Sequence, residues 1–273
     1  MVAGVAAVAG SATAQGDNGF LRGAGKTDLS LSYAMDRYDQ FWMGTKRVED
    51  PGVGEITRES LNLHIAHGVR EDLDFVFAAA FVDVENDGLA PFDDESDLQD
   101  MSVGVKWRVA PESVMAGGMF SLALAPALKI PMSSNENNTP TAIGDGQMDW
   151  RNRVIAQWCS AGGWWLAAET GYDIRAEEPG NEIPFNVTLG IPVGAQVTVM
   201  PFYAQTNSFG GRGYDIGQGD FPGVEEDIKR YGLSVYARVS EQLGFSIGVK
   251  STMDGKNTGD VDGGWWAGLT WKL

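Results

Sequence analysis

The amino-acid sequence predicts an all-β chain folded as an up-and-down antiparallel transmembrane β-barrel of about twelve strands. Apolar residues recur at every second position along a dozen segments. The alternate positions of several of these segments carry charges, and the connections alternate between short turns and long polar loops. An apolar outer face, a polar inner face and this alternation of connections are typical of a closed barrel in a membrane.

Composition excludes several other classes of protein. The 273 residues include 37 Asp and Glu against 20 Lys and Arg, so the formal net charge is -17. Nucleic-acid binding requires clustered cations, and we therefore expect no nucleic-acid partner. Hydrophobic residues make up 43% of the chain, which is too many for a disordered protein. No run of about 18 apolar residues occurs after residue 14, which excludes a helical membrane protein.

The first residues predict an export signal. Residues 1–14, MVAGVAAVAGSATA, form an apolar run that ends in a small-residue A-x-A pattern, typical of a signal peptide and its cleavage site. The basic n-region of such a signal is absent. No linker or change of composition divides the rest of the chain, so we expect residues 15–273 to form a single barrel domain.

Twelve segments carry the period-two pattern of strands with one apolar face. In the first segment Leu29, Leu31 and Tyr33 alternate with polar residues, and the fifth includes Pro126 in phase with its apolar positions. In chain order the segments are 29–35, 61–65, 75–81, 101–109, 122–130, 150–158, 164–174, 185–191, 196–205, 231–239, 243–249 and 265–273.

The connections predict how the barrel is oriented. Residues 68–72, 159–163 and 240–242 are short turns. The remaining connections are mostly long and polar, and the long ones are residues 37–56, 83–99, 133–146, 206–227 and 254–262. Outer-membrane barrels have short periplasmic turns and long external loops, so we assign the long loops to the outside.

Aromatic residues near strand ends favour lipid as the environment of the apolar face, because such residues form girdles at membrane interfaces. They are Tyr33, Trp107, Trp150, Trp158, Trp164, Tyr172 and Trp271. A secreted β-sandwich, with its apolar face turned inward, is the alternative. The final strand, which ends at Leu273, resembles the signal that outer-membrane proteins present to the barrel-assembly machinery.

Charged side chains on the opposite face are expected to line the lumen. These lumen-lining candidates are His64, Lys106, Arg108, Arg151, Arg153, Glu169, Asp173, Arg230, Arg238 and Lys250. Opposed charges in a pore select ions or polar solutes, whereas charges that pair and fill a narrow barrel close it; the sequence leaves both alternatives open. A turn centred on Ala161 would place Arg153 opposite Glu169, and Trp158 opposite Trp164.

One acidic loop carries the candidate metal ligands. Asp83, Glu85, Asp87 and Asp94 are spaced loosely like the ligands of a calcium loop, although the third and twelfth positions depart from that pattern. A loop-bound divalent cation, which would also bridge lipopolysaccharide phosphates, is the one cofactor that the sequence suggests. A solvated acidic loop without a metal is the alternative.

Aromatic residues in the long loops are candidates for the capture of hydrophobic solutes. These residues are Phe41, Trp42, Phe92, Phe209, Tyr214 and Phe221. The alternative is that their rings pack within the loops.

An outer-membrane lipid-modifying enzyme is the least favoured function. Such chemistry needs a His and a Ser side by side on the outer face of one strand. The only histidines, His64 and His67, lie in LNLHIAHGV, where no H-x-S pattern occurs. We therefore expect the chain not to be an enzyme.

Several segments resemble the outer-membrane proteins grouped as the meta-pathway of phenol degradation family. The matching segments are GKTDLSLSY at 25–33, LQDMSVGVKWRV at 98–109, LKIPMS at 128–133, IGDGQMDW at 143–150, DGKNTG at 254–259 and the terminal strand. The position after Pro131 departs from the expected Thr-Gly. The resemblance implies a barrel in the bacterial outer membrane, surrounded by lipid and lipopolysaccharide, that acts as a channel for passive uptake of small hydrophobic or aromatic solutes. A structural or adhesive barrel without an open pore is the main alternative.

Overall fold

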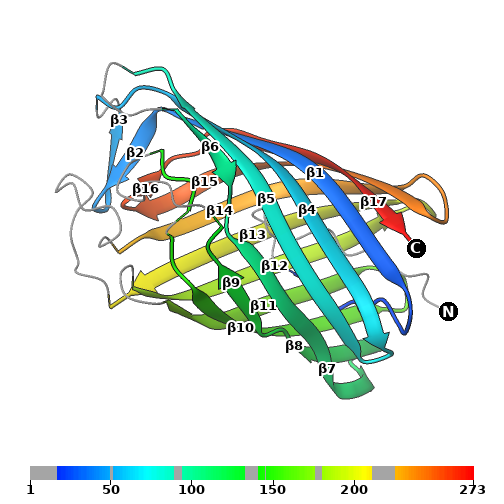
Figure 1. Cartoon of the computed structure of the whole chain (residues 1–273). Helices are drawn as coiled ribbons and strands as arrows, with labels where there is room; N and C mark the ends of the chain where they lie inside the picture. Colours follow the sequence, from blue (N-terminus) through cyan, green and yellow to red (C-terminus); the bar gives the residue numbers. More distant parts are fainter. Residues whose placement is uncertain are drawn as a thin grey trace.

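The computed structural model describes residues 17–49, 52–88, 94–132, 141–144, 146–175, 180–210 and 225–273. Their main feature is a closed antiparallel barrel (Figure 1). Its wall strands are β1 (Thr27–Tyr38), β4 (Ile56–Arg70), β5 (Leu73–Asn86), β7 (Met101–Met115), β8 (Gly118–Leu124) with β9 (Ala127–Ile130), β10 (Asp149–Ser160), β11 (Trp165–Arg175), β12 (Asn181–Val193), β13 (Val197–Phe209), β14 (Asp227–Arg238), β15 (Leu243–Lys256) and β17 (Gly264–Lys272).

The strand order confirms the predicted up-and-down topology. The main sheet has fourteen strands, of which β6 (Glu95–Leu98) is a short addition to β5, while β8 and β9 share one place in the wall. Twelve places therefore surround the lumen. The ring closes because β5 pairs with β7 and β1 pairs with β17, so the wall has no free edge facing lipid.

Three short strands form a second sheet at the end of the barrel that carries the long loops, which we call the loop end. They are β2 (Gln40–Met43), β3 (Lys46–Glu49) and β16 (Thr258–Gly259) (Figure 1). The opposite end, with the tight connections, is the turn end. Among the described residues, no helix is long and apolar enough to span a membrane.

The fifth predicted strand is interrupted at Pro126. Proline has no N–H to donate, so the wall continues there through its neighbours. The Ala125 N–H donates to the Arg153 carbonyl at 2.9 Å, and the Val105 N–H donates to the Pro126 carbonyl at 3.1 Å. β8 and β9 are consequently two segments of one wall position, and both lie between β7 and β10.

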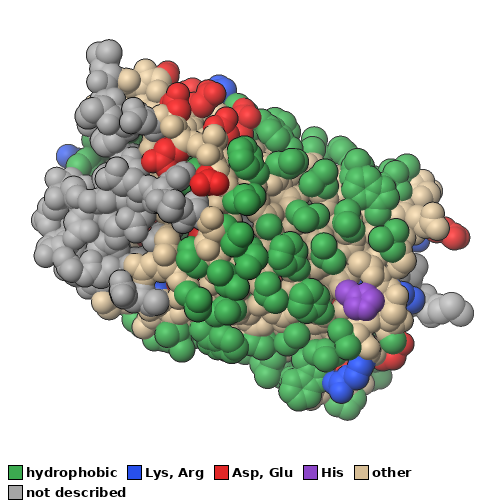
Figure 2. All heavy atoms as spheres, in the orientation of Figure 1, with side chains coloured by type: hydrophobic (Ala, Val, Ile, Leu, Met, Phe, Trp, Pro, Cys, Tyr) green, Lys and Arg blue, Asp and Glu red, His purple; other side chains and the backbone are tan. Residues whose placement is uncertain are grey.

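The outer face of the wall is apolar along the middle of the barrel. Outward positions such as Leu31, Phe81, Leu166, Leu233 and Leu269 are exposed. Figure 2 shows hydrophobic side chains covering the middle of this face, with acidic side chains gathered toward the loop end. β4 has 15 residues and β10 has 12, which exceeds the roughly 9–11 that a tilted strand needs to cross a bilayer. The fold class predicted from the alternation is confirmed.

The register between β10 and β11 differs from the predicted one. Trp158 lies opposite Leu166 rather than Trp164, and Arg153 lies opposite Gly171 rather than Glu169. The prediction was wrong because the turn is centred one residue later than Ala161. The Ser160 N–H donates to the Trp164 carbonyl at 2.8 Å, which makes Trp164 the last residue of the turn. The two indole rings still meet, with centroids 4.8 Å apart.

Candidate functional site

The inward side chains surround a cavity of about 290 Å³ in the middle of the lumen, which we call the central cavity. Its lining comes from both sides of the barrel, from β4, β5 and β7 to β13 and β14. The structure brings six of the ten lumen-lining candidates together around it: His64, Lys106, Arg151, Arg153, Glu169 and Arg230.

The other four candidates lie elsewhere on the inward face. Asp173 is buried beside the cavity in an ion pair with Arg153. Lys250 is buried toward the loop end, where its Nζ lies 2.7 Å from Asp36. Arg108 and Arg238 lie at the turn end, in contact with Glu112 at 3.1 Å and with the Ala195 carbonyl at 2.8 Å respectively.

Residues 17–26 run from the central cavity, which Asp17 lines, to the turn end of the barrel, where Ala24, Gly25 and Lys26 are exposed. We call them the N-terminal insert. The Asp17 N–H donates to Glu169 at 2.8 Å, and the Gly19 N–H donates to Gln157 at 2.8 Å. The buried Lys106 ammonium lies 3.3 Å from the Asp17 carboxylate and donates to the Asn18 carbonyl at 3.1 Å.

The insert also packs by its apolar and basic side chains. The Phe20 ring meets Trp165 edge-on, with centroids 5.5 Å apart. The Arg22 guanidinium group pairs with Asp28, and the Arg22 backbone N–H donates to the Asp74 carboxylate at 3.0 Å. Because Asp74 is fully buried, this contact fixes the insert to the wall at the turn end.

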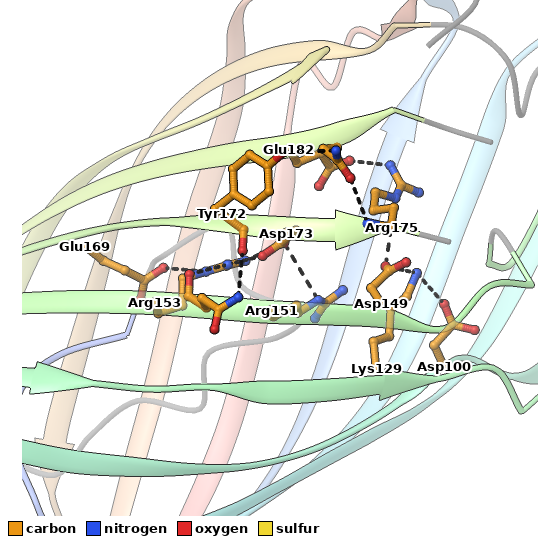
Figure 3. Close-up of polar contacts among 12 residues, drawn as sticks. Asp100, Lys129, Asp149, Arg151, Arg153, Glu169, Tyr172, Asp173, Arg175 and Glu182 are labelled. Carbon is orange, nitrogen blue, oxygen red and sulfur yellow. Dashed lines mark hydrogen bonds and ion pairs between the residues drawn. The ribbon is translucent and has the colours of Figure 1, made fainter. Parts of the chain in front are cut away.

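One network of ion pairs follows β10 and β11 along the wall of the central cavity (Figure 3). Arg153 binds Asp173 with both terminal nitrogens, and its Nε lies 3.5 Å from Glu169. Arg151 reaches the same Asp173 only at 3.9 Å. The contact between Arg153 and Glu169 is therefore diagonal across the strands, because Ile155 is the residue directly opposite Glu169.

A second network lies nearer the loop end (Figure 3). Lys129 lies 2.6 Å from Asp149 and 3.2 Å from Asp100, while Arg175 lies 2.5 Å from Glu182 and 3.8 Å from Asp149. These groups line a second cavity of about 290 Å³, which shares Ala78, Ser102 and Arg151 with the central cavity. Sequence reasoning missed this network because Asp100, Asp149, Arg175 and Glu182 lie just beyond the predicted strand segments, and only Lys129 lies within one.

Residues 141–144 fold into the loop end of the lumen. Arg58 donates to the Ala142 carbonyl at 3.2 Å and to the Ile143 carbonyl at 2.9 Å. Ile143 is buried in a cluster, which we call the mouth cluster, made of Phe41, Ile56, Ala80, Val82, Val84 and Ile143. The alternation of β4 already points Arg58 inward, but nothing in the sequence indicates its loop partner.

The loop aromatics do not form one exposed group. Phe41 is packed within the loops instead of being available for solute capture, because β2 folds over the loop end and buries this ring in the mouth cluster. Trp42 is half-buried against Gly255. Phe209 lies at the end of β13 on the outer wall, with its ring centroid 5.6 Å from Tyr172. The remaining three candidates, Phe92, Tyr214 and Phe221, lie outside the described residues.

The acidic candidates lie around the loop end of β5. Asp87 accepts a hydrogen bond from the Glu55 N–H at 2.7 Å, and Asp94 accepts one from the Asn86 N–H at 2.9 Å. Asp83 and Glu85 alternate with the inward Val82 and Val84 and so lie on the outer face. Within the described ranges, no group of three or more His, Cys, Asp or Glu side chains is arranged to hold a metal. A cation site in this loop stays a prediction.

Comparison with known proteins places the chain among membrane barrels. The profile of the family described as "Putative MetA-pathway of phenol degradation" matches residues 55–267. The COG4313 outer membrane channel from Pseudomonas putida F1 aligns with a TM-score of 0.75 at 11% identity, over 92% of this chain and 96% of that chain. The translocator domain of the autotransporter NalP from Neisseria meningitidis aligns with a TM-score of 0.54 at 12% identity, over 92% and 89%. None of the curated proteins is similar enough in sequence to count as a match. The shared fold and the apolar wall place the chain in the bacterial outer membrane.

Proposed function

The chain belongs to the family described as "Putative MetA-pathway of phenol degradation", and from this membership we propose that it is a passive channel for small hydrophobic or aromatic solutes. The solute would enter at the loop end, on the outside, and leave at the periplasmic turn end. The name of the family points to aromatic compounds, and the solved structure from Pseudomonas putida F1 is described as an outer membrane channel.

The central cavity is the observation that carries the proposal. It has a volume of about 290 Å³ and adjoins the second cavity toward the loop end. An engineered protein cavity of about 150 Å³ holds one benzene molecule, so this space accommodates a single-ring compound. A solute of that size therefore fits in the middle of the barrel.

The proposal assigns no catalysis to the chain. His64 lines the central cavity, while His67 Nδ1 lies 2.8 Å from the Thr27 hydroxyl at the turn end. In the described part of the chain, neither histidine forms a hydrogen bond with a serine hydroxyl. The arrangement that an outer-membrane esterase requires therefore receives no support here.

The membrane partners follow from the barrel itself. Lipid would surround the apolar wall, and lipopolysaccharide would lie around the acidic loop end. We extend the proposal to the barrel-assembly machinery, because the last strand, β17, closes the ring by pairing with β1.

A barrel without an open pore is the second candidate, and the N-terminal insert favours it. The insert occupies the lumen on the turn-end side of the central cavity, where it contacts Lys106, Gln157 and Asp74. A channel would then require the insert to move, or a solute to pass beside it.

Conductance across planar bilayers separates the two functions. We expect purified barrels to give discrete conductance steps that phenol, used as the probe solute, reduces in a concentration-dependent way. Liposomes that contain the barrel should also take up phenol faster than empty liposomes. Absence of conductance together with unchanged phenol uptake would contradict the channel and support a structural barrel.

A further inference from the structure

The central cavity differs in charge from the rest of the protein. The chain as a whole has a formal net charge of -17. The charged groups of the cavity lining are four cations, Lys106, Arg151, Arg153 and Arg230, and two carboxylates, Asp17 and Glu169. The lining residues of this acidic protein thus carry two surplus positive charges, one of which is offset by Asp173, which is buried beside the cavity.

Two arginines of the lining are the least well paired. Lys106 is paired with Asp17, and Arg153 is paired with both Glu169 and Asp173. Arg151 is left with a distant contact, at 3.9 Å, to the same Asp173. Among the described residues, Arg230 forms no ion pair, although its position on β14 faces the cavity.

In the described part of the chain, each of the two arginines has one N–H donor, at Nε, that lacks an acceptor. The Nε atoms of Arg151 and Arg230 are buried, and neither has a hydrogen-bond acceptor among the described residues. A buried donor without an acceptor costs free energy, and a guanidinium group carries up to five donors in a fork that matches a carboxylate. An anion in the cavity would satisfy these donors and offset the surplus charge.

The surplus is confined to the central cavity. In the second cavity the carboxylates Asp100, Asp149 and Glu182 balance the cations Lys129, Arg151 and Arg175. Arg151 lines both cavities, so the balanced second cavity adjoins the central cavity at this residue. An anion in the central cavity would therefore meet Arg151 and Arg230 with fewer competing carboxylates than in the second cavity.

Part of the remaining lining is apolar and fits a hydrophobic body, while Ser102, Asn186, Gln205 and Thr206 add uncharged polar groups. Val76, Ala78, Ala127, Ala204 and Ile228 line the same cavity as the two arginines. Their side chains offer no hydrogen bonds and exclude water from a bound ring. A ligand for this cavity therefore combines one anionic group with a small apolar part.

We propose that the central cavity is a binding site for small aromatic carboxylates, with the carboxylate held by Arg151 and Arg230 and the ring against the apolar lining. The proposal rests on the proposed channel function and names the class of solute that the channel selects. Benzoate fits the chemistry, because it joins one ring to one carboxylate and is small enough for about 290 Å³.

Calorimetry on the full chain in detergent tests the site without requiring conduction. Benzoate is compared with benzyl alcohol, which has a similar size and no charge, and with inorganic phosphate, which has charge and no ring. We expect benzoate to bind at least about tenfold more tightly than either probe. Arg151→Gln and Arg230→Gln should each weaken benzoate about tenfold, as expected for the loss of a hydrogen bond between charged groups.

Two further sets of variants serve as controls. Arg70→Gln removes one positive charge from an exposed turn, where Arg70 pairs with Asp72, and should leave benzoate binding unchanged. Arg151→Lys and Arg230→Lys keep the charge and should retain more affinity than the Gln variants. They also keep the test valid if a Gln variant fails to fold, which the gel mobility of the unheated barrel reports.

The outcomes separate this site from the channel function. Equal binding of benzoate and benzyl alcohol, or equal loss in Arg70→Gln, would overturn the site even if the barrel conducts. Phosphate binding as tight as benzoate binding would overturn the assignment to aromatic carboxylates. Selective benzoate binding by a barrel that does not conduct would support the site and contradict the channel.

Discussion

At the scale of single residues, the lumen is shaped by aromatic rings that lie on glycines of the next strand. Trp165 lies opposite Gly190, Phe202 opposite Gly232, and Trp266 opposite Gly248. Trp165 and Trp266 are almost fully buried. A glycine opposite each ring leaves room for the ring to lie along the wall, so bulky residues occupy a narrow barrel without blocking it.

Replacing one of these glycines tests this packing. Gly190→Ala adds a Cβ that would overlap the Trp165 ring. Overpacking of a filled interior typically costs about 1–3 kcal/mol, and we expect a loss of this size in the free energy of unfolding, measured by urea titration. Gly263→Ala is the matched control, because a Cβ there meets no atom within 4 Å. Equal stability of the two variants would show that the ring adapts at no cost.

The sequence predicts the direction of a side chain better than its partner. Alternation along a strand follows from the pleat, and it places Lys106 and Arg153 inward from the sequence alone. Which acid Arg153 meets depends on the register of β10 and β11, and a turn centred one residue later than expected changes that register. Phe41 shows the same limit in a loop, because its burial depends on distant residues such as Ile56.

At the scale of elements, the twelve wall strands are predictable, whereas the conformation of the N-terminal insert is not. The strands carry a long repeating pattern, and the break at Pro126 is visible as a single exception within it. Residues 17–26 have no such pattern. Their conformation depends instead on hydrogen bonds between their backbone and side chains of the wall. The insert takes its conformation from the lumen that surrounds it.

Loosening the insert should be measurable by hydrogen exchange. Lys106→Met keeps the aliphatic stem but removes the ammonium group that binds Asp17 and the Asn18 carbonyl. Each hydrogen bond to a charged group contributes about 1.5–3 kcal/mol. We therefore expect amide exchange in the insert, including at Gly19, to accelerate about tenfold or more. The single-channel conductance should rise as well, because the insert narrows the turn end.

Replacement of a neighbouring cation by methionine supplies the control. Arg108→Met alters the next inward position of β7, whose side chain pairs with Glu112 rather than with the insert. Its exchange at Gly19 should match that of the unaltered chain. If Lys106→Met also left this exchange unchanged, the insert would be held mainly by Arg22 and Asp74.

At the scale of the whole molecule, the alternation separates an apolar outer wall from a charged interior. In Figure 2, most of the visible acidic side chains lie toward the loop end, and hydrophobic side chains cover the middle of the wall. Averaged over the sequence, these two surfaces give a mean hydropathy of only -0.17, which resembles that of a soluble protein. The position of each residue along its strand, rather than the average composition, therefore determines what the lipid meets.

A charge moved along the outer face of β14 tests this arrangement. Leu233 lies in the middle of the strand and Val239 lies just beyond its turn end, and both are exposed. An arginine on the lipid face of a barrel costs about 2–4 kcal/mol at the bilayer midplane and about 0–1 kcal/mol near the interface. Reversible unfolding in lipid vesicles should therefore show a loss of about 2–4 kcal/mol for Leu233→Arg and at most about 1 kcal/mol for Val239→Arg. Equal losses for the two variants in vesicles would mean that depth in lipid does not set the stability of this wall.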